Sequence, residues 1–356
     1  MRDFASILIY APSWIGDAVM SLGAIRYLRG AYPKARVVVL ARPWVADLYQ
    51  CCEAVDGTLS YDSRGAHRGA LGFLRAAREL KEARFDLALL LPNAFRAAAL
   101  VRASGIPERW GYATEGRGFL LTRPVPPAPR PFGRHQVFYY LDLLRSLGVP
   151  VGKPRYDLAL TDAMSRRAAD LLGRRGWHGR QERLVGIHAG ATNSSSKRWL
   201  PERYAEVGAR LAASHDARIV LFAGPEEADL AGEIASRLAP PRLMVAEGTS
   251  LGELMGLLGS LSVLLTNDSG PMHLASALGV PTVAVFGPTD ERETGPLGPR
   301  AQVVRQPVEC SPCLLRECPI DHRCMLQIEV AEVYQVAVGF LDKDTRAEGR
   351  TQAALP

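Results

Sequence analysis

Three loops in the second half of the sequence combine small residues with hydroxyls and charges, as anion-binding loops do. The first lies within residues 266–275, between an apolar run that predicts a strand and a segment with helical periodicity. Asp268 or Ser269 could cap that helix, and Gly270 would let an anion approach the first-turn amides at the positive end of the helix dipole. A diphosphate fits this description, and His273 would either contact it or pack beside it. An ordinary capped turn after a buried strand is an equally supported alternative.

The second loop follows the expected strand 184–188 and runs up to the next helix. Its candidate residues are Gly190, Ala191, Thr192, Lys197 and Arg198. Small side chains let a ligand approach the backbone, and the two basic side chains supply charge to a phosphate. A Lys-Arg pair alone usually lies on the surface, but its position beside a glycine loop favours phosphate binding.

The third loop places Gly224 and Glu227 directly after another expected strand, 218–222. These residues could border a base or a ribose. They could equally form a tight turn whose acidic residues complement a helix dipole. The sequence leaves both interpretations open.

In the first half of the chain, Asp17 is the carboxylate placed to act as a base. It follows the short apolar run 7–10, closely after Ser13, and precedes a helix expected over residues 18–31. A carboxylate in this position can accept a proton from an attacking hydroxyl. An Asp at a helix start is more often only a cap, so position alone does not decide between the two roles.

Four of the six cysteines are close together in the sequence, at Cys310, Cys313, Cys318 and Cys324. This spacing could gather four thiolates on one structural zinc, although single-zinc sites usually present two separated pairs. The prolines of the same segment could instead stiffen a loop whose thiols are unligated or redox-active. A reducing compartment favours either possibility over disulfides.

Apolar runs alternate with helical segments along both halves, which predicts an α/β protein with parallel sheets. The expected strands are 7–10, 37–40 and 87–91 in the first half, and 184–188, 218–222, 263–266 and 282–286 in the second. Ligands of such sheets bind at the carboxyl ends of the strands. We therefore expect the active site in a cleft between two Rossmann-like halves.

The length of 356 residues suits two domains of similar size. We expect an N-terminal domain over 1–165, a C-terminal domain over 166–327, a closing helix over 328–342 that packs back on the N-terminal domain, and a frayed tail over 343–356. No apolar run approaches the roughly 18 residues of a membrane span. The N-terminus does not resemble a secretory signal, so the expected compartment is the cytoplasm.

Positive charge concentrates in the first half of the chain. Residues 61–145 hold fourteen Arg and Lys against seven Asp and Glu, whereas the net charge of the whole chain is +6. The helix expected over 69–83 has a basic face. The excess predicts an anionic partner, such as nucleic acid, a phospholipid surface or a phosphorylated substrate, unless it is only a solvated arginine-rich face.

Taken together and in this order, five strings make the chain resemble the lipopolysaccharide heptosyltransferases of glycosyltransferase family 9, most closely those of type II. The strings are Pro12-Ser13-Trp14-Ile15-Gly16-Asp17-Ala18-Val19-Met20, Gly190-Ala191 with Lys197-Arg198-Trp199, Phe222-Ala223-Gly224, Thr266-Asn267-Asp268-Ser269-Gly270-Pro271-Met272-His273 and Phe286-Gly287-Pro288-Thr289. The resemblance runs from about residue 7 to residue 341.

The resemblance implies a GT-B fold, with two Rossmann-like domains facing across a cleft, the first for the acceptor and the second for the donor. It implies inverting transfer of L-glycero-D-manno-heptose from ADP-heptose to the Kdo/heptose–lipid A inner core, with no cofactor and no catalytic metal. Asp17 would be the general base. Lys197 and the amides near Ser269 and Gly270 would stabilise the leaving diphosphate. The implied donor-binding residues are Gly190, Ala191, Thr192, Lys197, Arg198, Gly224, Glu227, Asp268, Ser269, Gly270 and His273.

The implied acceptor carries phosphates and carboxylates, which gives the basic half a partner without invoking nucleic acid. The candidate contacts are Ser13, Asn93, Arg96, Arg117, His135 and Tyr139. Because the acceptor's acyl chains lie in the inner leaflet, peripheral contact with the inner face of the inner membrane is also expected. Two alternatives stay open: a related enzyme for another nucleotide sugar, such as an epimerase or another transferase, and a non-catalytic nucleotide-sugar-binding module. Asp17 favours catalysis, because binding alone needs no base.

Overall fold

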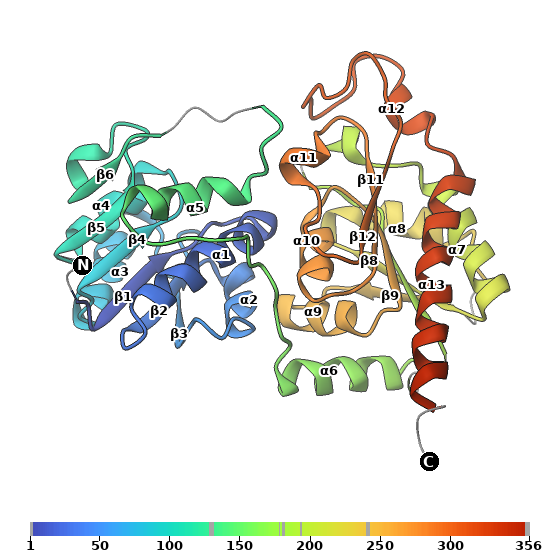
Figure 1. Cartoon of the computed structure of the whole chain (residues 1–356), viewed down its shortest axis with the longest axis horizontal. Coiled ribbons are helices and arrows are strands. Elements are labelled where there is room, and N and C mark those ends of the chain that lie inside the picture. Colours follow the sequence, from blue (N-terminus) through green and yellow to red (C-terminus); the bar gives the residue numbers. More distant parts are fainter. Residues whose placement is uncertain are drawn as a thin grey trace. The chain divides into compact units, whose positions relative to one another are not determined.

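The computed structural model divides into two compact units, residues 1–159 and 160–356, each built on one six-stranded sheet (Figure 1). It describes residues 3–127, 132–177, 179, 182–192, 194–239 and 243–352, without the side chains of residues 247 and 344–352. All of the strand pairs are parallel. The α/β class with parallel sheets is therefore confirmed. Among the described residues, no helix is both long and apolar enough to cross a membrane.

Unit 1 has the strand order β3-β2-β1-β4-β5-β6. Its strands are β1 (Ser6–Tyr10), β2 (Arg36–Ala41), β3 (Gly57–Ser60), β4 (Leu87–Leu90), β5 (Glu108–Tyr112) and β6 (Arg123–Val125). Its helices are α1 (Ile15–Ala31), α2 (Ala46–Gln50), α3 (Gly69–Glu82), α4 (Phe95–Ala103) and α5 (Val137–Ser146), with short 3-10 turns η1 (Pro43–Val45) and η2 (Gly118–Leu120). The order reverses between β1 and β4, so the loops that follow these two strands diverge and leave room for a ligand.

Unit 2 has the strand order β12-β11-β10-β7-β8-β9 and reverses between β7 and β10. Its strands are β7 (Leu184–His188), β8 (Arg218–Ala223), β9 (Leu243–Glu247), β10 (Val263–Asn267), β11 (Thr282–Phe286) and β12 (Ala301–Arg305). Its helices are α6 (Asp162–Gly173), α7 (Pro201–His215), α8 (Ala228–Ala235), α9 (Leu251–Gly259), α10 (Gly270–Ala277), α11 (Glu291–Thr294), α12 (Arg323–Leu326) and α13 (Val330–Gln352), with 3-10 turns η3 (Ser195–Lys197) and η4 (Pro225–Glu227).

The central strands were predictable because both of their faces are covered. Every residue of β7, β10 and β11 is buried, as the uninterrupted apolar runs of a parallel sheet require. The edge strands β3 and β12 are mostly half-buried, and their mixed sequences did not indicate strands. The third edge strand, β6, is only three residues long and contains a proline, so it did not indicate a strand either.

The closing helix differs from the expectation that it packs back on the N-terminal domain. Val333, Ala337 and Leu341 of α13 are fully buried in the core cluster of unit 2, which also contains Val185 of β7. These three side chains recur every four residues and form one apolar stripe, which α7 and the sheet of unit 2 cover. The helix also continues to Gln352, through most of the expected frayed tail, and residues 353–356 lie outside the described residues.

The boundary between the units lies at residues 159 and 160, six residues before the expected one at 165 and 166. The reason is α6, which packs on α9 through a close backbone approach. A Cβ at Gly256 of α9 would lie 2.6 Å from the carbonyl oxygen of Met164. The whole of α6 therefore belongs to unit 2.

Candidate functional site

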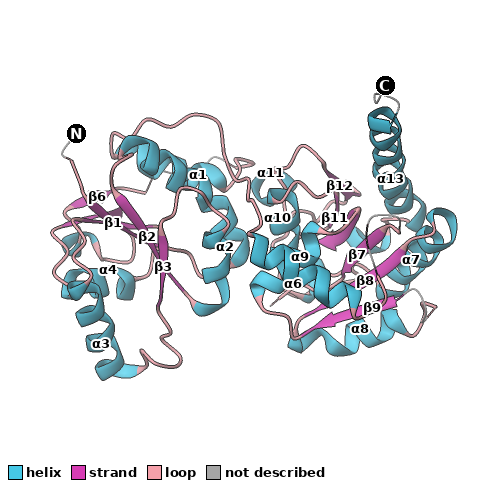
Figure 2. Ribbon diagram, turned by 90° about the horizontal axis from the view of Figure 1, so that it is seen from below, coloured by secondary structure: helices cyan, strands magenta, loops and turns pink. Residues whose placement is uncertain are grey.

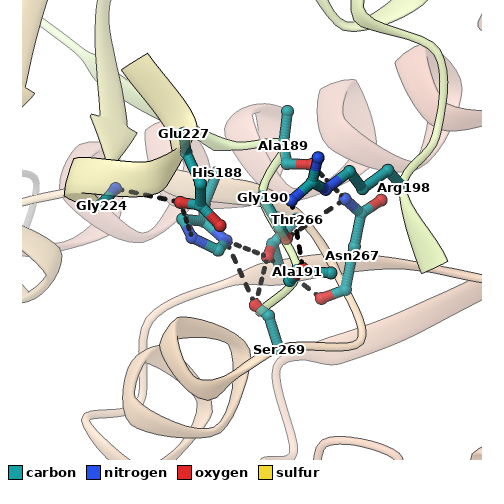
Figure 3. A network of polar contacts seen from close by, with 10 residues as sticks. All are labelled: His188, Ala189, Gly190, Ala191, Arg198, Gly224, Glu227, Thr266, Asn267 and Ser269. Atoms are coloured by element: carbon teal, nitrogen blue, oxygen red, sulfur yellow. Dashed lines mark hydrogen bonds and ion pairs between the residues drawn. The ribbon is translucent and has the colours of Figure 1, made fainter. Parts of the chain in front are cut away.

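The three candidate loops of unit 2 converge at the carboxyl ends of β7, β8 and β10, which are neighbours in the sheet (Figure 3). The point where the strand order reverses lies between β7 and β10. Ligands of doubly wound sheets bind at such a point. The topology alone therefore brings together residues that are up to about eighty positions apart in the sequence.

Asn267, the last residue of β10, ties the first two loops together. Its side-chain amide donates to the carbonyl oxygens of Ala189, at 2.6 Å, and Gly190, at 3.4 Å. Its side-chain oxygen accepts from the Tyr204 hydroxyl and from the backbone N–H of Trp199. The buried amide is thus fully satisfied and fixes the shape of the β7 loop. Sequence reasoning did not list Asn267, although its place directly before Asp268 was a usable signal.

His188, at the end of β7, connects the first loop to the third. Its Nδ1 lies 3.2 Å from the Ser269 hydroxyl and 3.4 Å from that of Thr266. Its Nε2 lies 3.5 Å from a carboxylate oxygen of Glu227. Ser269 occupies the N-cap position of α10, but its side chain makes no capping hydrogen bond. Of the two capping residues that the sequence allowed, Ser269 does not cap the helix with its side chain, because its hydroxyl points to His188 and Thr266 instead.

Glu227 is held as a buried anion between the second and third loops. Its carboxylate accepts the backbone N–H of Gly224 at 2.9 Å. A Cβ at Gly190 would lie 1.9 Å from the same carboxylate, so a larger residue there would displace Glu227. Burial alone would raise the pKa of Glu227, but the hydrogen bond and charge of His188, the Gly224 N–H and the charge of Arg198 outweigh it and lower the pKa to about 2.

The depressed pKa of Glu227 makes a prediction about stability. A carboxyl whose pKa falls on folding contributes stability above its unfolded pKa, and that contribution is lost as the pH falls through the folded value. The Glu227→Gln variant should therefore unfold more easily than the wild type at pH 7, by about 2 kcal/mol. This deficit should shrink as the pH falls from about 4.5 toward 2. Urea unfolding at several pH values measures it.

Glu226 provides the matched control, because it is the exposed neighbour of Glu227. The Glu226→Gln variant should match the wild type at every pH, since an exposed carboxyl has little to lose. A deficit of Glu227→Gln that stays constant with pH would contradict the assigned electrostatic origin.

Lys197 and Asp268 form the most direct charge pair of the site. The ammonium nitrogen lies 2.7 Å from a carboxylate oxygen of Asp268. The Asp268 side chain is 6% exposed and that of Lys197 27%, so the cation keeps a face toward solvent. Arg198 donates to the carbonyl oxygen of Ala191 at 3.4 Å.

The remaining candidates of unit 2 lie on the same loops. Thr192 is exposed in the turn after β7, Gly270 is the first residue of α10, and His273 is a buried residue of that helix. The structure thus places all of the predicted donor residues on the loops at one edge of the sheet.

In unit 1, Asp17 lies on the first turn of α1, where a tyrosine hydroxyl contacts its carboxylate. The N-cap of α1 is Trp14, so Asp17 does not occupy the cap position. The Tyr140 hydroxyl donates to Oδ1 of Asp17 at 3.1 Å. The next residue back, Tyr139, donates to the side-chain oxygen of Asn93 at 2.8 Å. Helix α5 therefore links the start of α1 to the loop after β4.

Two of the acceptor candidates hold the fold of unit 1. The guanidinium of Arg117 is fully buried and donates to the carbonyl oxygens of Tyr112, Pro92 and Ala94. These bonds give Arg117 a structural role in unit 1, and its assignment as an acceptor contact stays a prediction. His135 accepts the backbone N–H of Val137 at the start of α5.

The last two acceptor candidates lie at the carboxyl ends of the central strands. Arg96 is exposed on α4, where its Nε donates to the Tyr61 hydroxyl at 3.0 Å. Ser13 is half-buried after β1, and its carbonyl oxygen accepts the indole N–H of Trp44. Both positions leave polar atoms near the reversal point of the sheet.

The cysteine segment does not form the zinc site that its spacing allowed. Within the described parts of the chain, no three His, Cys, Asp or Glu side chains are grouped to hold a metal. Cys310 is exposed and Cys324 is buried, and all of the cysteines are free. Burial, and to a lesser extent the three neighbouring cysteines, raises the pKa of Cys324 to about 11. Its thiol therefore stays protonated at neutral pH.

The same segment instead braces the turn that carries Lys197. The Ser196 hydroxyl donates to the carbonyl oxygen of Leu315, and the Ser196 N–H donates to that of Arg316. The carbonyl of Ser196 lies 2.6 Å from Nε2 of His322. The loop between β12 and α12 therefore fixes η3, and with it the start of the lysine side chain.

The chain is similar to known heptosyltransferases over most of its length. Residues 73–323 match the family described as Glycosyltransferase family 9 (heptosyltransferase). Lipopolysaccharide heptosyltransferase 2 of Escherichia coli K12 is 30% identical over 327 residues, which are 84% of this chain and 87% of that protein. The structure of E. coli ADP-heptose lps heptosyltransferase II superposes with a TM-score of 0.79 at 26% identity, covering 96% of this chain and 99% of that one.

A further structure, E. coli heptosyltransferase WaaC with ADP-2-deoxy-2-fluoro heptose, has a TM-score of 0.69 at 21% identity. It covers 95% of this chain and 99% of the other. At that identity it supports the fold alone. Together with the two parallel sheets, these similarities confirm the expected fold, GT-B.

Proposed function

This chain belongs to glycosyltransferase family 9, the heptosyltransferases, and we propose that it moves L-glycero-D-manno-heptose from ADP-heptose onto the Kdo/heptose–lipid A inner core, as a type II enzyme. Transfer of heptose in core biosynthesis follows from the family and from its lipopolysaccharide relatives. The donor is proposed from the relative whose name includes ADP-heptose. The observation that carries the proposal is the charge pair of Lys197 with Asp268 beside the start of α10, in a chain that also holds Asp17.

The donor's diphosphate would lie against the three loops of unit 2. Lys197 supplies a positive charge, and the first-turn amides of α10 supply the positive end of a helix dipole. Glu227 is an anion throughout the working pH range, so it accepts hydrogen bonds, and ribose hydroxyls are donors of the right kind. Asn267 and His188 hold these groups in place.

The transfer step is a displacement at the anomeric carbon of the heptose. An acceptor hydroxyl oxygen forms the new bond to that carbon while the bond to the phosphate oxygen breaks. The hydroxyl proton goes to the carboxylate of Asp17, and the electron pair leaves with ADP. Attack opposite the leaving group inverts the anomeric configuration. Lys197 and the α10 amides stabilise the charge that develops on the diphosphate.

The acceptor would bind to unit 1. Asn93 and Arg96 follow the carboxyl end of β4, and Tyr139 of α5 donates to Asn93. Arg96 can pair with a phosphate or carboxylate of the core. The basic excess of residues 61–145 gives such an acceptor a favourable field. We place the reaction in the cytoplasm, at the inner face of the inner membrane where the lipid anchor of the acceptor lies.

The experiment that tests this function incubates the protein with ADP-heptose and truncated cores of defined length, with products identified by mass. We expect one added heptose on a core that already carries a heptose, and ADP as the other product. Binding of ADP-heptose by calorimetry without turnover on any core would favour a non-catalytic module. Transfer from a UDP-sugar in place of ADP-heptose would favour another sugar chemistry.

Tyr140 is expected to act as a positioning residue for Asp17. Burial, together with the neighbouring Asp17 charge, raises its pKa well above that of an ordinary tyrosine, so it remains a donor at all working pH values. A donor to a carboxylate favours the charged form and lowers its pKa. In Tyr140→Phe, kcat should therefore fall about tenfold, and the acidic limb of the kcat profile should move to higher pH.

A pH profile separates this role from a purely structural one. Tyr32→Phe, which removes a buried tyrosine hydroxyl just beyond the other end of α1, should leave both kcat and the profile unchanged. The KM for ADP-heptose should not change in either variant. A lower kcat in Tyr140→Phe with an unmoved acidic limb would argue against the hydrogen bond to Asp17 as the cause.

A further inference from the structure

Helix α3 presents two leucines to solvent. Leu71 is 84% exposed and Leu74 60%. They are three positions apart, so they lie on the same face of the helix. The opposite face, with Ala76, Ala77 and Leu80, is buried in the core of unit 1. Packing in the core therefore accounts for the apolar residues on the buried face of α3. It does not account for Leu71 and Leu74 on the exposed face.

Two exposed aromatic side chains lie close by, one on α4, which packs on α3, and one on η2, which packs on α4. Helix α4 packs beside α3 (Figure 2), and the Arg96 guanidinium of α4 stacks over the Phe73 ring of α3 at 5.1 Å. Phe95, at the start of α4, and Phe119, in η2, have ring centroids 6.1 Å apart and are 44% and 76% exposed. Exposed apolar side chains gathered on adjacent elements mark an interaction surface more often than single ones do.

The polar residues around these leucines are predominantly basic. Residues 64–84 contain six basic residues and two acidic ones: Arg64, Arg68, Arg75, Arg78, Lys81 and Arg84 against Glu79 and Glu82. Each acidic residue already pairs with an arginine, Glu79 with Arg75 at 3.1 Å and Glu82 with Arg78 at 2.8 Å. Both pairs are exposed and therefore weak, so either arginine can leave its carboxylate for another anion. With its six basic and two acidic residues, the segment keeps a formal net charge of +4.

The exposed arginines continue the leucine face. Arg75 follows Leu71 by four positions, and Arg78 follows Leu74 by four, so the stripe runs from apolar to basic along one side of the helix. An arginine can lay its aliphatic stem along an apolar surface while its guanidinium reaches a phosphate. Leucines flanked by arginines on one helix face are the pattern of helices that lie in the plane of a membrane interface.

We propose that α3 docks unit 1 on an anionic phospholipid surface. Leu71 and Leu74 enter the boundary between headgroups and acyl chains, and Arg75 and Arg78 contact the phosphates. The charge of the segment complements anionic lipid headgroups. The biological purpose of this docking rests on the proposed function, since an enzyme reaches a lipid-anchored acceptor at a bilayer. The physical basis of the docking is the composition and exposure of α3 itself.

The test is sedimentation of the full-length protein with vesicles that contain phosphatidylglycerol and no lipopolysaccharide. We expect the wild type to bind them, and to bind phosphatidylcholine vesicles weakly. The Leu71→Ser/Leu74→Ser variant should bind about tenfold more weakly. The Arg75→Gln/Arg78→Gln variant should also bind more weakly, and its binding should depend less on salt.

Two matched controls come from unit 2. Leu314→Ser/Leu326→Ser removes two other exposed leucines, and Arg210→Gln breaks an exposed pair with Glu206 of the same i,i+4 kind. Both should bind like the wild type. Undiminished binding by Leu71→Ser/Leu74→Ser, or no binding by the wild type, would overturn the proposal. So would a wild-type dimer in lipid-free sedimentation that the same variant dissociates, because the face would then serve self-association.

Measurements of heptose transfer distinguish failure of the docking proposal from failure of the proposed function. On a deacylated, water-soluble core, the wild type and Leu71→Ser/Leu74→Ser should transfer heptose equally well. Absence of transfer by both would contradict the proposed function and leave the vesicle result standing. A loss confined to the variant on the soluble core would mean that the leucines bind the acceptor sugar, which would overturn the docking role.

Discussion

The Asp17→Asn variant is expected to lose at least about a hundredfold in kcat, within the roughly 10²–10⁴ range for removal of a general base. Asparagine has nearly the same shape, and its amide oxygen can still accept the Tyr140 hydroxyl that now bonds Oδ1 at 3.1 Å. What disappears is the ability to take the acceptor's proton. Binding of ADP-heptose, measured by calorimetry, should be unchanged, because the donor loops belong to unit 2.

Asp142→Asn is the matched control for this variant. Asp142 also lies in unit 1, on the same helix as Tyr140, and pairs with Arg134 and Arg145 near the surface. Its loss should leave kcat within about twofold of the wild type, since exposed ion pairs contribute little. Near-normal turnover by Asp17→Asn at saturating donor and acceptor would overturn the assignment of the base.

The sequence predicted the parts of the fold that are encoded locally. Strands β7, β10 and β11 are largely apolar because both of their faces are buried. Such runs can be recognised in the sequence without knowing which segments pack against them. The closing helix shows the limit. Its apolar stripe could be recognised in the sequence, but the surface that buries the stripe depends on where α7 lies in three dimensions.

The candidate site follows the same division. The three candidate loops of unit 2 were predictable because each is a contiguous segment that follows a strand. The contacts that hold them were not, since His188 and Ser269 are 81 positions apart and Tyr140 and Asp17 are 123 apart. The structural contacts of Arg117 were missed for a related reason: the sequence gives the charge of a residue but not its burial.

The Lys197→Met variant is expected to lower kcat by about 10²–10³, the usual effect of removing one group that stabilises the leaving charge. Methionine keeps much of the apolar stem and removes only the charge. The KM for ADP-heptose should rise less than kcat falls, because the charge on the diphosphate is greatest in the transition state. Steady-state kinetics with a truncated core separate the two parameters, and Lys34→Met, far away in the sequence of unit 1, should have no effect.

A second substitution, at Asp268, distinguishes two roles of Lys197: stabilising the leaving group, or only positioning Asp268. Removing the ammonium leaves a carboxylate that is 6% exposed without the partner now 2.7 Å away, so Lys197→Met should also lose about 1–2 kcal/mol of stability, less than a fully buried pair would. In Lys197→Met/Asp268→Asn the unpaired charge is gone, and most of that stability should return. The rate should stay low, since the diphosphate still lacks its cation. Recovery of kcat in the double variant would mean that the lysine serves only to position Asp268.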